Sequence, residues 1–324
     1  MPEIPLVSVI VPAFNAGRVL AETLSSVRSQ TFRDFEVIIN VDDGSTDDTE
    51  AVSSLFCDTD RRFILIMSPH TNRSRARNRA LEHARGEFVA FLDADDVWFP
   101  EKLAAQMALF QEEPRVNFAF TDYFFWDGQR EWGPYYQKYK RFPEESPVRQ
   151  LISANVFGTS TVTARRAAVV KAGGFDPNLE HAEDWDMWLR IAEQGLWARG
   201  TRRSLVRYRC WPGNASKQRH KALEGDVLML EKRLHSTCQP SWRPLYKRSL
   251  AHARAELEVF QAGCRMRSLI ENGNLSAVPP SVLRLWRCQP RWKWLRWYMR
   301  LVWPKFLGGD KTAQYVHQKI LNRW

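Results

Sequence analysis

Three aspartates stand close together in the segment FLDADDVW, residues 91–98. Asp93, Asp95 and Asp96 follow an apolar run, so a buried strand would end in three negative charges within four positions. Repulsion between such neighbours raises their pKa values unless a cation or hydrogen-bond donors offset it. The segment therefore predicts a positive partner for these carboxylates, with metal binding and an ordinary acidic turn as the two alternatives.

A second acidic turn lies in VDDGSTDDT, residues 41–49. Gly44 suits a tight turn, and Ser45 or Thr46 is expected to cap the helix that follows. We expect that helix to begin near Asp47. The alternative is that one of the two leading aspartates only stabilises the turn.

A third group of acids opens the segment HAEDWDMWLRIAEQG, residues 181–195. Its apolar residues have the i, i+3, i+4, i+7 spacing of a buried helix face, and Gly195 fits the helix stop. Asp184 falls at the edge of that face and is expected to look into a cleft, whereas Glu183 and Asp186 are expected to face solvent. The alternative is that all three acids only favour the positive end of the helix.

Strand-like and helix-like segments alternate in the first half of the chain. The runs of strand length are residues 7–11, 35–41, 63–67, 88–92 and 118–123. The segments with helical spacing are residues 19–27, 47–56, 74–84, where Gly86 is the expected stop, and 101–110. This alternation predicts an α/β domain around a mostly parallel sheet. Ligands of such sheets bind at the carboxyl ends of the strands, so both acidic turns are expected to face one crevice.

The order of these segments resembles the family 2 glycosyltransferases over about residues 5–215. The resemblance is carried by VSVIVPAFN at 7–15, VDDGSTDDT at 41–49, SRARNRAL at 74–81, GEFVAFLDADD at 86–96 and EDWDMWLR at 183–190. It implies the GT-A fold of nucleotide-diphosphosugar transferases, with a Rossmann-like mixed sheet. We therefore expect a catalytic domain over residues 1–215 and a helical, basic, Trp-rich region over 216–324.

The resemblance also implies which residues contact the nucleotide base. Pro12, Ala13 and Phe14, at the end of the first strand, would pack against the base. Asp43 would hydrogen-bond it, with Asp42 as the less favoured partner.

Further positions follow from the same resemblance. Asn72, Arg77 and Asn78 lie in the segment that lines the nucleotide pocket in the family, although Arg77 could instead brace that pocket. Asp95 is the implied metal ligand, and Asp93, nearer the ribose, is a second metal or nucleotide contact. The cation would be Mg²⁺ or Mn²⁺, and it would neutralise the diphosphate.

The implied reaction moves a sugar, with inversion, from a UDP-sugar to a glycan or lipid-linked acceptor. Asp184 would be the catalytic base that takes the acceptor's proton. Two departures from the family pattern stand out: Arg73 and Ser74 follow Asn72 where a small residue or Gly is common, and Cys210 and Trp211 lie where many members have a His. Two alternatives are a sugar-nucleotide nucleotidyltransferase, for which the single glycine of PAFNAGRVL is a poor phosphate loop, and a non-catalytic scaffold with the same fold.

The composition fits a globular protein of one large domain with an appendage, or of two domains. The chain has 324 residues and 44% hydrophobic content. Its five cysteines are scattered, which indicates neither a zinc site nor a disulfide framework and fits the cytoplasm. No stretch approaches the roughly 20 apolar residues that span a bilayer, and MPEIPLVSVIVPAF is expected to be a first strand rather than a signal peptide.

The charge is distributed unevenly along the chain. Residues 1–200 hold 22 Lys and Arg against 30 Asp and Glu, about −8, whereas residues 201–324 hold 25 against 7, about +18. The segment SVLRLWRCQPRWKWLRWYMRLVWPKF, residues 281–306, interleaves arginine and lysine with tryptophan. This pattern is typical of a helix on an anionic membrane, so we expect a peripheral protein on the inner face of the cell membrane. The alternative is that these tryptophans pack on protein; nucleic-acid binding is not expected, because the first half is acidic.

Overall fold

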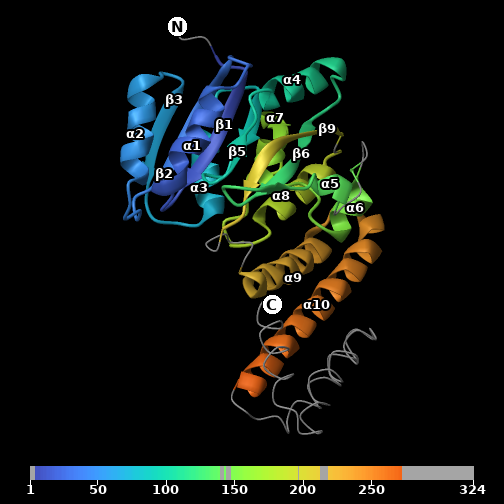
Figure 1. Ribbon diagram of the computed structural model, residues 1–324. Helices are drawn as coiled ribbons and strands as arrows, with labels where there is room; N and C mark the ends of the chain where they lie inside the picture. The colour runs from blue at the N-terminus through green and yellow to red at the C-terminus, as the bar shows by residue number, and fades with distance from the viewer. Residues whose placement is uncertain (1–3, 139–141, 144–146, 196, 212–217, 272–324) are drawn as a thin grey trace. The chain divides into compact units, whose positions relative to one another are not determined.

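The computed structural model describes residues 4–138, 142–143, 147–195, 197–211 and 218–271 (Figure 1). The chain divides into two compact units. The first contains residues 1–218 and 228–249, and the second contains residues 219–227 and 250–324. The expected boundary near residue 215 stays a prediction.

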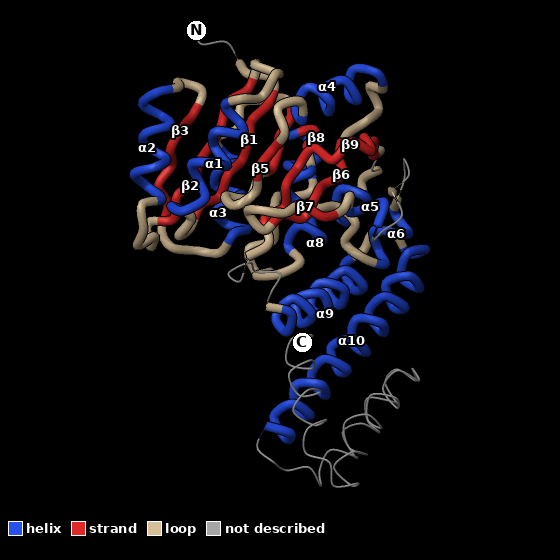
Figure 2. The backbone as a smooth tube through the Cα atoms, in the orientation of Figure 1, coloured by secondary structure: helices blue, strands red, loops and turns tan. Residues whose placement is uncertain are grey.

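A mixed sheet organises the first unit. Its strand order is β3-β2-β1-β4-β8-β6-β9-β5, and β7 pairs with β6. Figure 2 shows the strands of this sheet in red. The strands are β1 (Val7–Ala13), β2 (Phe35–Asp42), β3 (Phe63–Ser68), β4 (Phe88–Phe91), β5 (Val97–Trp98), β6 (Phe118–Trp126), β7 (Glu131–Trp132), β8 (Thr163–Arg165) and β9 (Ala198–Arg209). The pairs β1–β2, β2–β3 and β1–β4 are parallel, while β8 is antiparallel to both β4 and β6. The five predicted strands are confirmed.

Helices separate the strands along the chain and continue beyond the last of them. They are α1 (Gly17–Arg28), α2 (Thr49–Thr59), α3 (Arg73–Glu82), α4 (Lys102–Glu112), α5 (Tyr135–Lys138), α6 (Val148–Ser153), the 3₁₀ helix η1 (Thr159–Thr161), α7 (Arg166–Lys171), α8 (Glu183–Glu193), α9 (Arg219–Ser236), the 3₁₀ helix η3 (Pro240–Trp242) and α10 (Arg243–Glu271). The predicted helices are confirmed, and α9 and α10 confirm the helical character expected of the C-terminal region over its described residues, 218–271. Gly195, at φ +95°, ends α8 as predicted.

Two predictions about helix ends are wrong. Helix α2 begins at Thr49, and its first turn is held by the Asp47 carboxylate, which accepts the backbone N–H of Thr49 (3.1 Å), rather than by Ser45 or Thr46. Helix α3 ends at Glu82, before Gly86. A Cβ on Gly86 would lie 2.7 Å from the backbone nitrogen of Ser8, so this glycine is required by close packing against β1.

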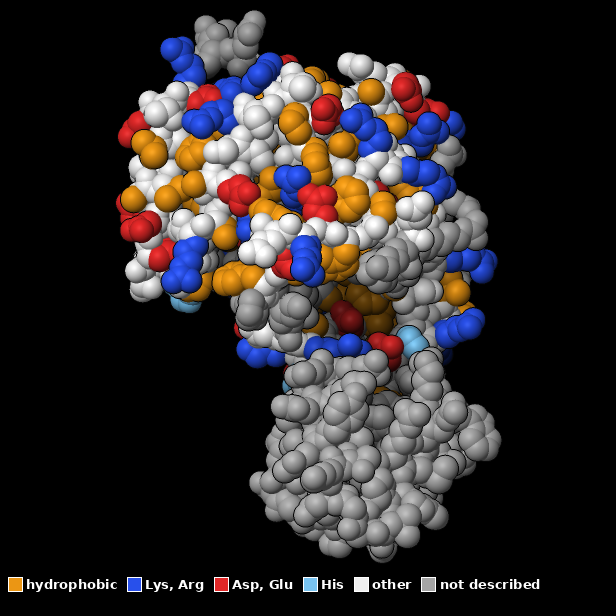
Figure 3. Space-filling model, in the orientation of Figure 1, with side chains coloured by type: hydrophobic (Ala, Val, Ile, Leu, Met, Phe, Trp, Pro, Cys, Tyr) orange, Lys and Arg blue, Asp and Glu red, His pale blue; other side chains and the backbone are white. Residues whose placement is uncertain are grey.

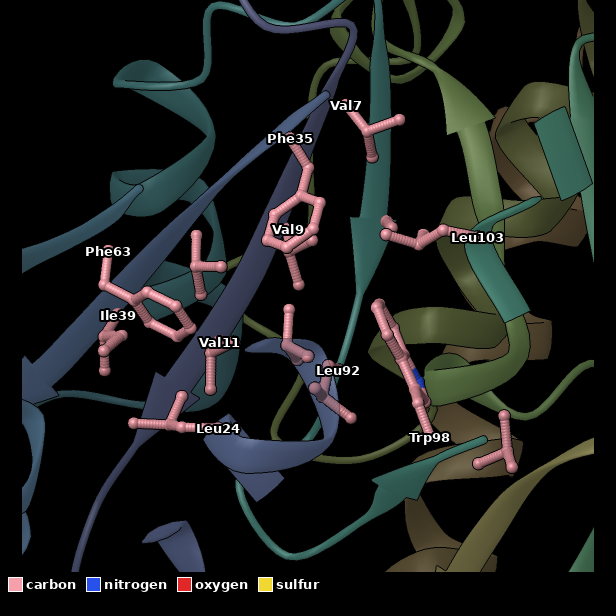
Figure 4. Packing of buried hydrophobic residues seen from close by; sticks show 14 of the residues in the cluster. Val7, Val9, Val11, Leu24, Phe35, Ile39, Phe63, Leu92, Trp98 and Leu103 are labelled. Atoms are coloured by element: carbon pink, nitrogen blue, oxygen red, sulfur yellow. The ribbon is translucent and has the colours of Figure 1, made fainter. Parts of the chain in front are cut away.

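The core lies on the parallel strands. Every residue of β1 and β2 is buried, as expected for parallel strands covered on both faces. Val9 and Val11 of β1 pack with Ile39 and Phe63, and Leu24 of α1 belongs to the same cluster (Figure 4). This packing fixes the carboxyl ends of the strands, from which both acidic turns project.

The surface of the first unit and the described helices bear on the expected membrane contact. On the face of the first unit in Figure 3, acidic and basic side chains are intermixed with exposed hydrophobic ones. Among the described helices, none combines the length and the apolar character needed to cross a membrane. The segment 281–306 lies outside the described residues, so its expected membrane contact stays a prediction.

Candidate active site

The acidic turn after β4 is held from two sides. Ser160 Oγ accepts the backbone N–H of Asp93 (3.1 Å) and donates to Asp96 Oδ2 (2.5 Å). Arg209 of β9 donates its backbone N–H to Asp96 Oδ1 (2.9 Å) and its Nε–H to the carbonyl oxygen of Asp95 (2.7 Å). Burial, followed by the charges of Asp95 and Asp93, raises the pKa of Asp96 well above its ordinary value. Asp96 is therefore an internal support of the turn.

Asp95 lies on the more open side of the same turn. It is half-buried, and its Oδ2 accepts a hydrogen bond from the indole Nε1–H of Trp211 (2.9 Å). Burial, followed by the charge of Asp93, raises the pKa of Asp95. A bound cation would favour the ionised form that burial and repulsion disfavour. The structure thus places an indole donor, rather than a histidine, beside the expected metal ligand.

Arg77 of α3 links this turn to α8. Its guanidinium is only 1% exposed, its Nη2–H donates to Asp93 Oδ1 (2.6 Å) and its Nη1–H donates to Glu183 Oε1 (2.7 Å). Burial alone would lower the pKa of Arg77, but the two carboxylates raise it. The nucleotide contact expected of Arg77 stays a prediction, and its ion pairs show it bracing the two acidic groups.

The prediction that Glu183 and Asp186 face solvent is wrong. Their side chains are buried, with residue exposures of 5% and 0%. Asp186 pairs with Arg190 (2.7 Å) and with Arg233 of α9 (3.4 Å). Buried carboxylates need charged or hydrogen-bonding partners. Most of these partners are distant in the sequence, so helical periodicity could not reveal them.

Asp184 is in the first turn of α8, where it was expected. Its Oδ1 accepts the backbone N–H of Trp185 (2.7 Å), and its Oδ2 accepts hydrogen bonds from Asn155 Nδ2 (3.0 Å) and Thr159 Oγ1 (2.9 Å). Burial, followed by the charge of Glu183, raises the pKa of Asp184 to about 6. A carboxylate with this pKa is mostly ionised at pH 7 and is well suited to accept a proton.

An exposed aromatic pair marks the corner where β1 and β3 end. Phe14, directly after β1, is 49% exposed, and its ring centroid lies 5.0 Å from that of His70, which follows β3. His70 Nδ1 lies 2.8 Å from Asp42 Oδ1. A Cβ on Gly44 would lie 3.0 Å from the His70 ring, so the glycine leaves room for this imidazole. The corner offers flat rings suited to a planar ligand.

The remaining residues expected at the base have different environments. Pro12 and Ala13 are the last two residues of β1 and are buried, so Phe14 presents more surface to a ligand than either. Asp42 is also buried and accepts the backbone N–H groups of Gly44, in its own turn, and of Thr71, after β3, whereas Asp43 is exposed. Asp43 is thus the aspartate of this turn that a ligand can reach.

The two asparagines expected in the nucleotide pocket hold the chain together. Asn72 caps α3 by accepting the backbone N–H of Arg75 (3.1 Å) and donates to the carbonyl oxygen of Pro177 (2.7 Å). Asn78 exchanges two hydrogen bonds with the backbone of Phe175 (2.7 and 2.8 Å). Their contact with a nucleotide stays a prediction, and in the structure they fasten α3 to the loop before α8.

The acidic turn fits a cation that arrives with a diphosphate. Within the described part of the chain, no group of three or more His, Cys, Asp or Glu is placed to hold a metal ion. Asp93 and Asp95 provide two carboxylates, and burial, followed by the charge of Asp93, raises the pKa of Asp95. Mg²⁺ and similar cations in nucleotide sites need only one or two protein carboxylates, because phosphates and water complete the coordination.

Five residues that touch this site were not predicted from the sequence. They are His70, Trp211, Asn155, Thr159 and Ser160. Each makes its contact across 25 or more positions of sequence. The only local signal is the hydroxyl run TST at residues 159–161, which is also common in ordinary turns.

Comparisons with known proteins agree on one family. The model of glycosyl transferase family 2 matches residues 8–172. A Bacillus subtilis (strain 168) protein named as a teichuronic acid biosynthesis glycosyltransferase, TuaG, is 33% identical over 220 residues, which are 67% of this chain and 84% of that protein. An Escherichia coli protein, WfaP, is 34% identical over 219 residues, 67% of this chain and 82% of its own length. It is named UDP-Glc:alpha-D-GlcNAc-diphosphoundecaprenol beta-1,3-glucosyltransferase.

Solved structures show the same fold. S. aureus TarS 1–349 in complex with UDP-GlcNAc matches with a TM-score of 0.60 at 18% identity, over 98% of this chain and 91% of that one. The mannosyltransferase PcManGT from Pyrobaculum calidifontis, in complex with GDP-Man and Mn²⁺, matches with a TM-score of 0.62 at 19% identity, over 99% of this chain and 86% of that one. At these identities the likeness concerns the fold.

Proposed function

Because the chain belongs to glycosyl transferase family 2 and has the GT-A fold, we propose that it transfers a sugar, with inversion, from a UDP-sugar to a lipid-linked saccharide. The observation that carries this proposal is the separation of two carboxylate environments. The turn at Asp93 and Asp95 is suited to a cation and diphosphate, while Asp184 accepts hydrogen bonds from another segment and has a pKa of about 6. Arg77 joins the two groups through its ion pairs.

In the proposed reaction, the acceptor hydroxyl oxygen forms a bond to the anomeric carbon while the bond from that carbon to the diphosphate breaks. Asp184 takes the hydroxyl proton, and UDP leaves with the electron pair of the broken bond. Attack on the face opposite the diphosphate inverts the anomeric centre. Proton transfer to a positioned base typically contributes about 10²- to 10⁴-fold in rate.

The acidic turn would serve the leaving group. Asp95, with Asp93, would hold Mg²⁺ or Mn²⁺, which when bound supplies positive charge that stabilises the departing diphosphate. Arg77 fixes one oxygen of Asp93 and keeps this carboxylate oriented. Trp211 and Arg209 position Asp95 from the β9 side.

A uracil-containing donor is supported by the corner beside β1. Phe14 offers an aromatic face and Asp43 an exposed carboxylate, which can accept a hydrogen bond from the base. The name of WfaP specifies UDP-Glc as donor, and that of a second E. coli relative, WfgD, 30% identical over 187 residues, specifies the same donor. We therefore take UDP-glucose as the first donor to test.

The acceptor proposal rests on the names of the relatives and on the basic C-terminal region. WfaP and WfgD are named for a diphosphoundecaprenol-linked acceptor, and TuaG for teichuronic acid biosynthesis. We propose a cytoplasmic protein held at the inner membrane face by residues 281–306, acting in surface polysaccharide or lipopolysaccharide assembly. Truncation after residue 280 is expected to abolish co-sedimentation with anionic liposomes. As a matched control, binding of the soluble donor UDP-glucose is expected to be unchanged. Retained co-sedimentation would favour packing of these tryptophans on protein.

The test of the reaction is a transfer assay with UDP-glucose, Mn²⁺ and a synthetic GlcNAc-diphosphate-lipid. The expected product is a β-linked disaccharide on the lipid, with UDP released. Asp184→Asn is expected to keep the affinity for UDP and to reduce turnover by about 10²- to 10⁴-fold, because the amide cannot take the proton. Near-normal turnover of this variant would remove Asp184 as the base. Formation of UTP and glucose 1-phosphate from UDP-glucose and added pyrophosphate, without any disaccharide product, would instead point to nucleotidyl transfer.

The pH dependence gives an independent check. A base must be ionised to act, so the rate is expected to fall as the pH drops through about 6, the pKa of Asp184, and to level off above it. A rate that is flat from pH 5 to pH 8 in the wild-type enzyme would contradict this assignment.

A further inference from the structure

The short segment from Asn155 to η1 holds one side of the Asp184 carboxylate. Asp184 Oδ2 accepts hydrogen bonds from Thr159 Oγ1 (2.9 Å) and from Asn155 Nδ2 (3.0 Å). Asn155 Oδ1 in turn accepts the backbone N–H of Phe157 (3.3 Å), which orients its amide nitrogen toward Asp184. Thr159 is 9% exposed, so its hydroxyl is shielded from bulk water.

The two carboxylate oxygens of Asp184 are therefore occupied differently. Each oxygen of an ionised carboxylate can accept about two hydrogen bonds. In the described part of the chain, Oδ2 has two donors, whereas Oδ1 has the backbone N–H of Trp185 (2.7 Å) alone. Oδ1 thus keeps one position for an incoming proton.

We propose that Thr159 and Asn155 are positioning residues that lock the Asp184 carboxylate and leave Oδ1 as the oxygen that receives the acceptor's proton. The inference rests on the proposed role of Asp184 as the base. It assigns a task to a segment that no catalytic step otherwise uses.

The same segment also fixes the acidic turn. Ser160, the residue after Thr159, contacts both the backbone of Asp93 and the carboxylate of Asp96. The 3₁₀ helix therefore sets the base and the proposed cation site from adjacent residues. A change in its conformation would move both together.

Two charged groups near Asp184, Glu183 and Arg77, also affect the pKa of its carboxyl group. Glu183 on the same helix raises the pKa of Asp184, and Arg77 of α3, which pairs with both Glu183 and Asp93, lowers it. Thr159 donates without carrying a charge, and its hydrogen bond stabilises the ionised carboxylate. Removing that donor should favour the protonated acid.

The main test is a titration of [¹³Cγ]Asp-labelled, metal-free protein by NMR, with the Asp184 signal identified by its loss in Asp184→Asn. Thr159→Val removes the hydroxyl at nearly constant shape and is expected to raise the midpoint by roughly one pH unit, the order expected for one hydrogen bond to a charged group. Thr159→Ser keeps the hydroxyl and is expected to restore the wild-type midpoint. An unchanged midpoint in Thr159→Val would overturn the proposal.

Thr161→Val is the matched control. Thr161 lies in the same 3₁₀ helix, and its hydroxyl donates to the carbonyl oxygen of Gly158 (2.7 Å) rather than to Asp184. This variant is expected to keep the wild-type midpoint even if it loses stability. A shift as large as that of Thr159→Val would show that general disturbance of the helix is responsible, and would contradict the proposal.

Asn155→Ala provides a second variant for the NMR titration if Thr159→Val does not fold, and its midpoint is expected to shift in the same direction.

In the transfer assay, Thr159→Val is expected to move the acid limb of the kcat–pH profile to higher pH by the same amount, with the KM for UDP-glucose unchanged. A uniform fall in kcat at every pH, without a shift, would indicate a purely structural role. Full turnover of Asp184→Asn would instead refute the proposed base, and the NMR result would stand apart from that failure.

Discussion

The two acidic turns of this protein have similar sequences but satisfy their negative charge in opposite ways. In the turn after β2, the first aspartate, Asp42, is buried and accepts hydrogen bonds from the backbone of Thr71, from His70 and from the backbone of Gly44. Burial alone would raise the pKa of Asp42, but these donors more than offset it, and the pKa lies below its ordinary value. This turn is electrostatically complete without a ligand.

The turn after β4 lacks that compensation. Burial and the charge of Asp93 raise the pKa of Asp95, and Asp96 is affected in the same direction and more strongly. The donors from Trp211 and Arg209 limit the repulsion without removing it. A pair of aspartates is therefore a better indicator of a cation site when burial and mutual repulsion outweigh the hydrogen bonds that the fold supplies to it.

The proposed difference between the two turns can be tested by removing one charge from each of them. Asp95→Asn is expected to weaken Mn²⁺-dependent binding of UDP by on the order of 100-fold, because it deletes a charged ligand of the cation. Asp43→Asn is the matched control, since it removes an exposed carboxylate from the other turn. We expect it to weaken UDP binding about 10-fold, the value of one good hydrogen bond, with the Mn²⁺ dependence preserved.

Calorimetric titration with UDP, in Mn²⁺ and then in EDTA, measures both effects. Equal Mn²⁺ dependence in Asp95→Asn and the wild-type protein would mean that the cation binds elsewhere. Loss of the Mn²⁺ dependence in Asp43→Asn would assign the cation to the turn after β2 and would reverse the comparison.

Much of the catalytic half could be predicted from the sequence because its signals are local. The strands at the start of the sheet are nearly continuous apolar runs, and the acidic motifs directly follow two of them. Strand β9 was missed because its 12 residues, ARGTRRSLVRYR, are rich in arginine and lack an apolar run of strand length at their start. Strands β5 and β7 have only two residues each and carry no pattern.

The partners of the site residues were the part that could not be predicted. Glu183 looks like a solvent-exposed acid of a helix start, yet it is buried because Arg77, 106 positions away, pairs with it. Trp211 resembles a surface residue after a strand, yet it donates to Asp95, 116 positions away. Such contacts depend on how β4, β9 and α8 are arranged in space, and a single sequence does not reveal that arrangement.

The smallest effect tests the completeness of the turn after β2. Asp42→Asn keeps the shape but places an amide N–H₂ against the backbone N–H of Thr71 or of Gly44, so we expect a loss of about 1–3 kcal/mol in the free energy of unfolding at pH 7. The folded-state pKa of Asp42 is lowered, so its contribution is fully present above the unfolded value of about 3.9 and is lost as the pH falls through the folded value. Urea unfolding of both proteins at pH 7 and at a series of values below 4 should therefore give curves that converge as the pH drops. A constant difference down to pH 3 would show that the ionised form of Asp42 is not what this turn stabilises.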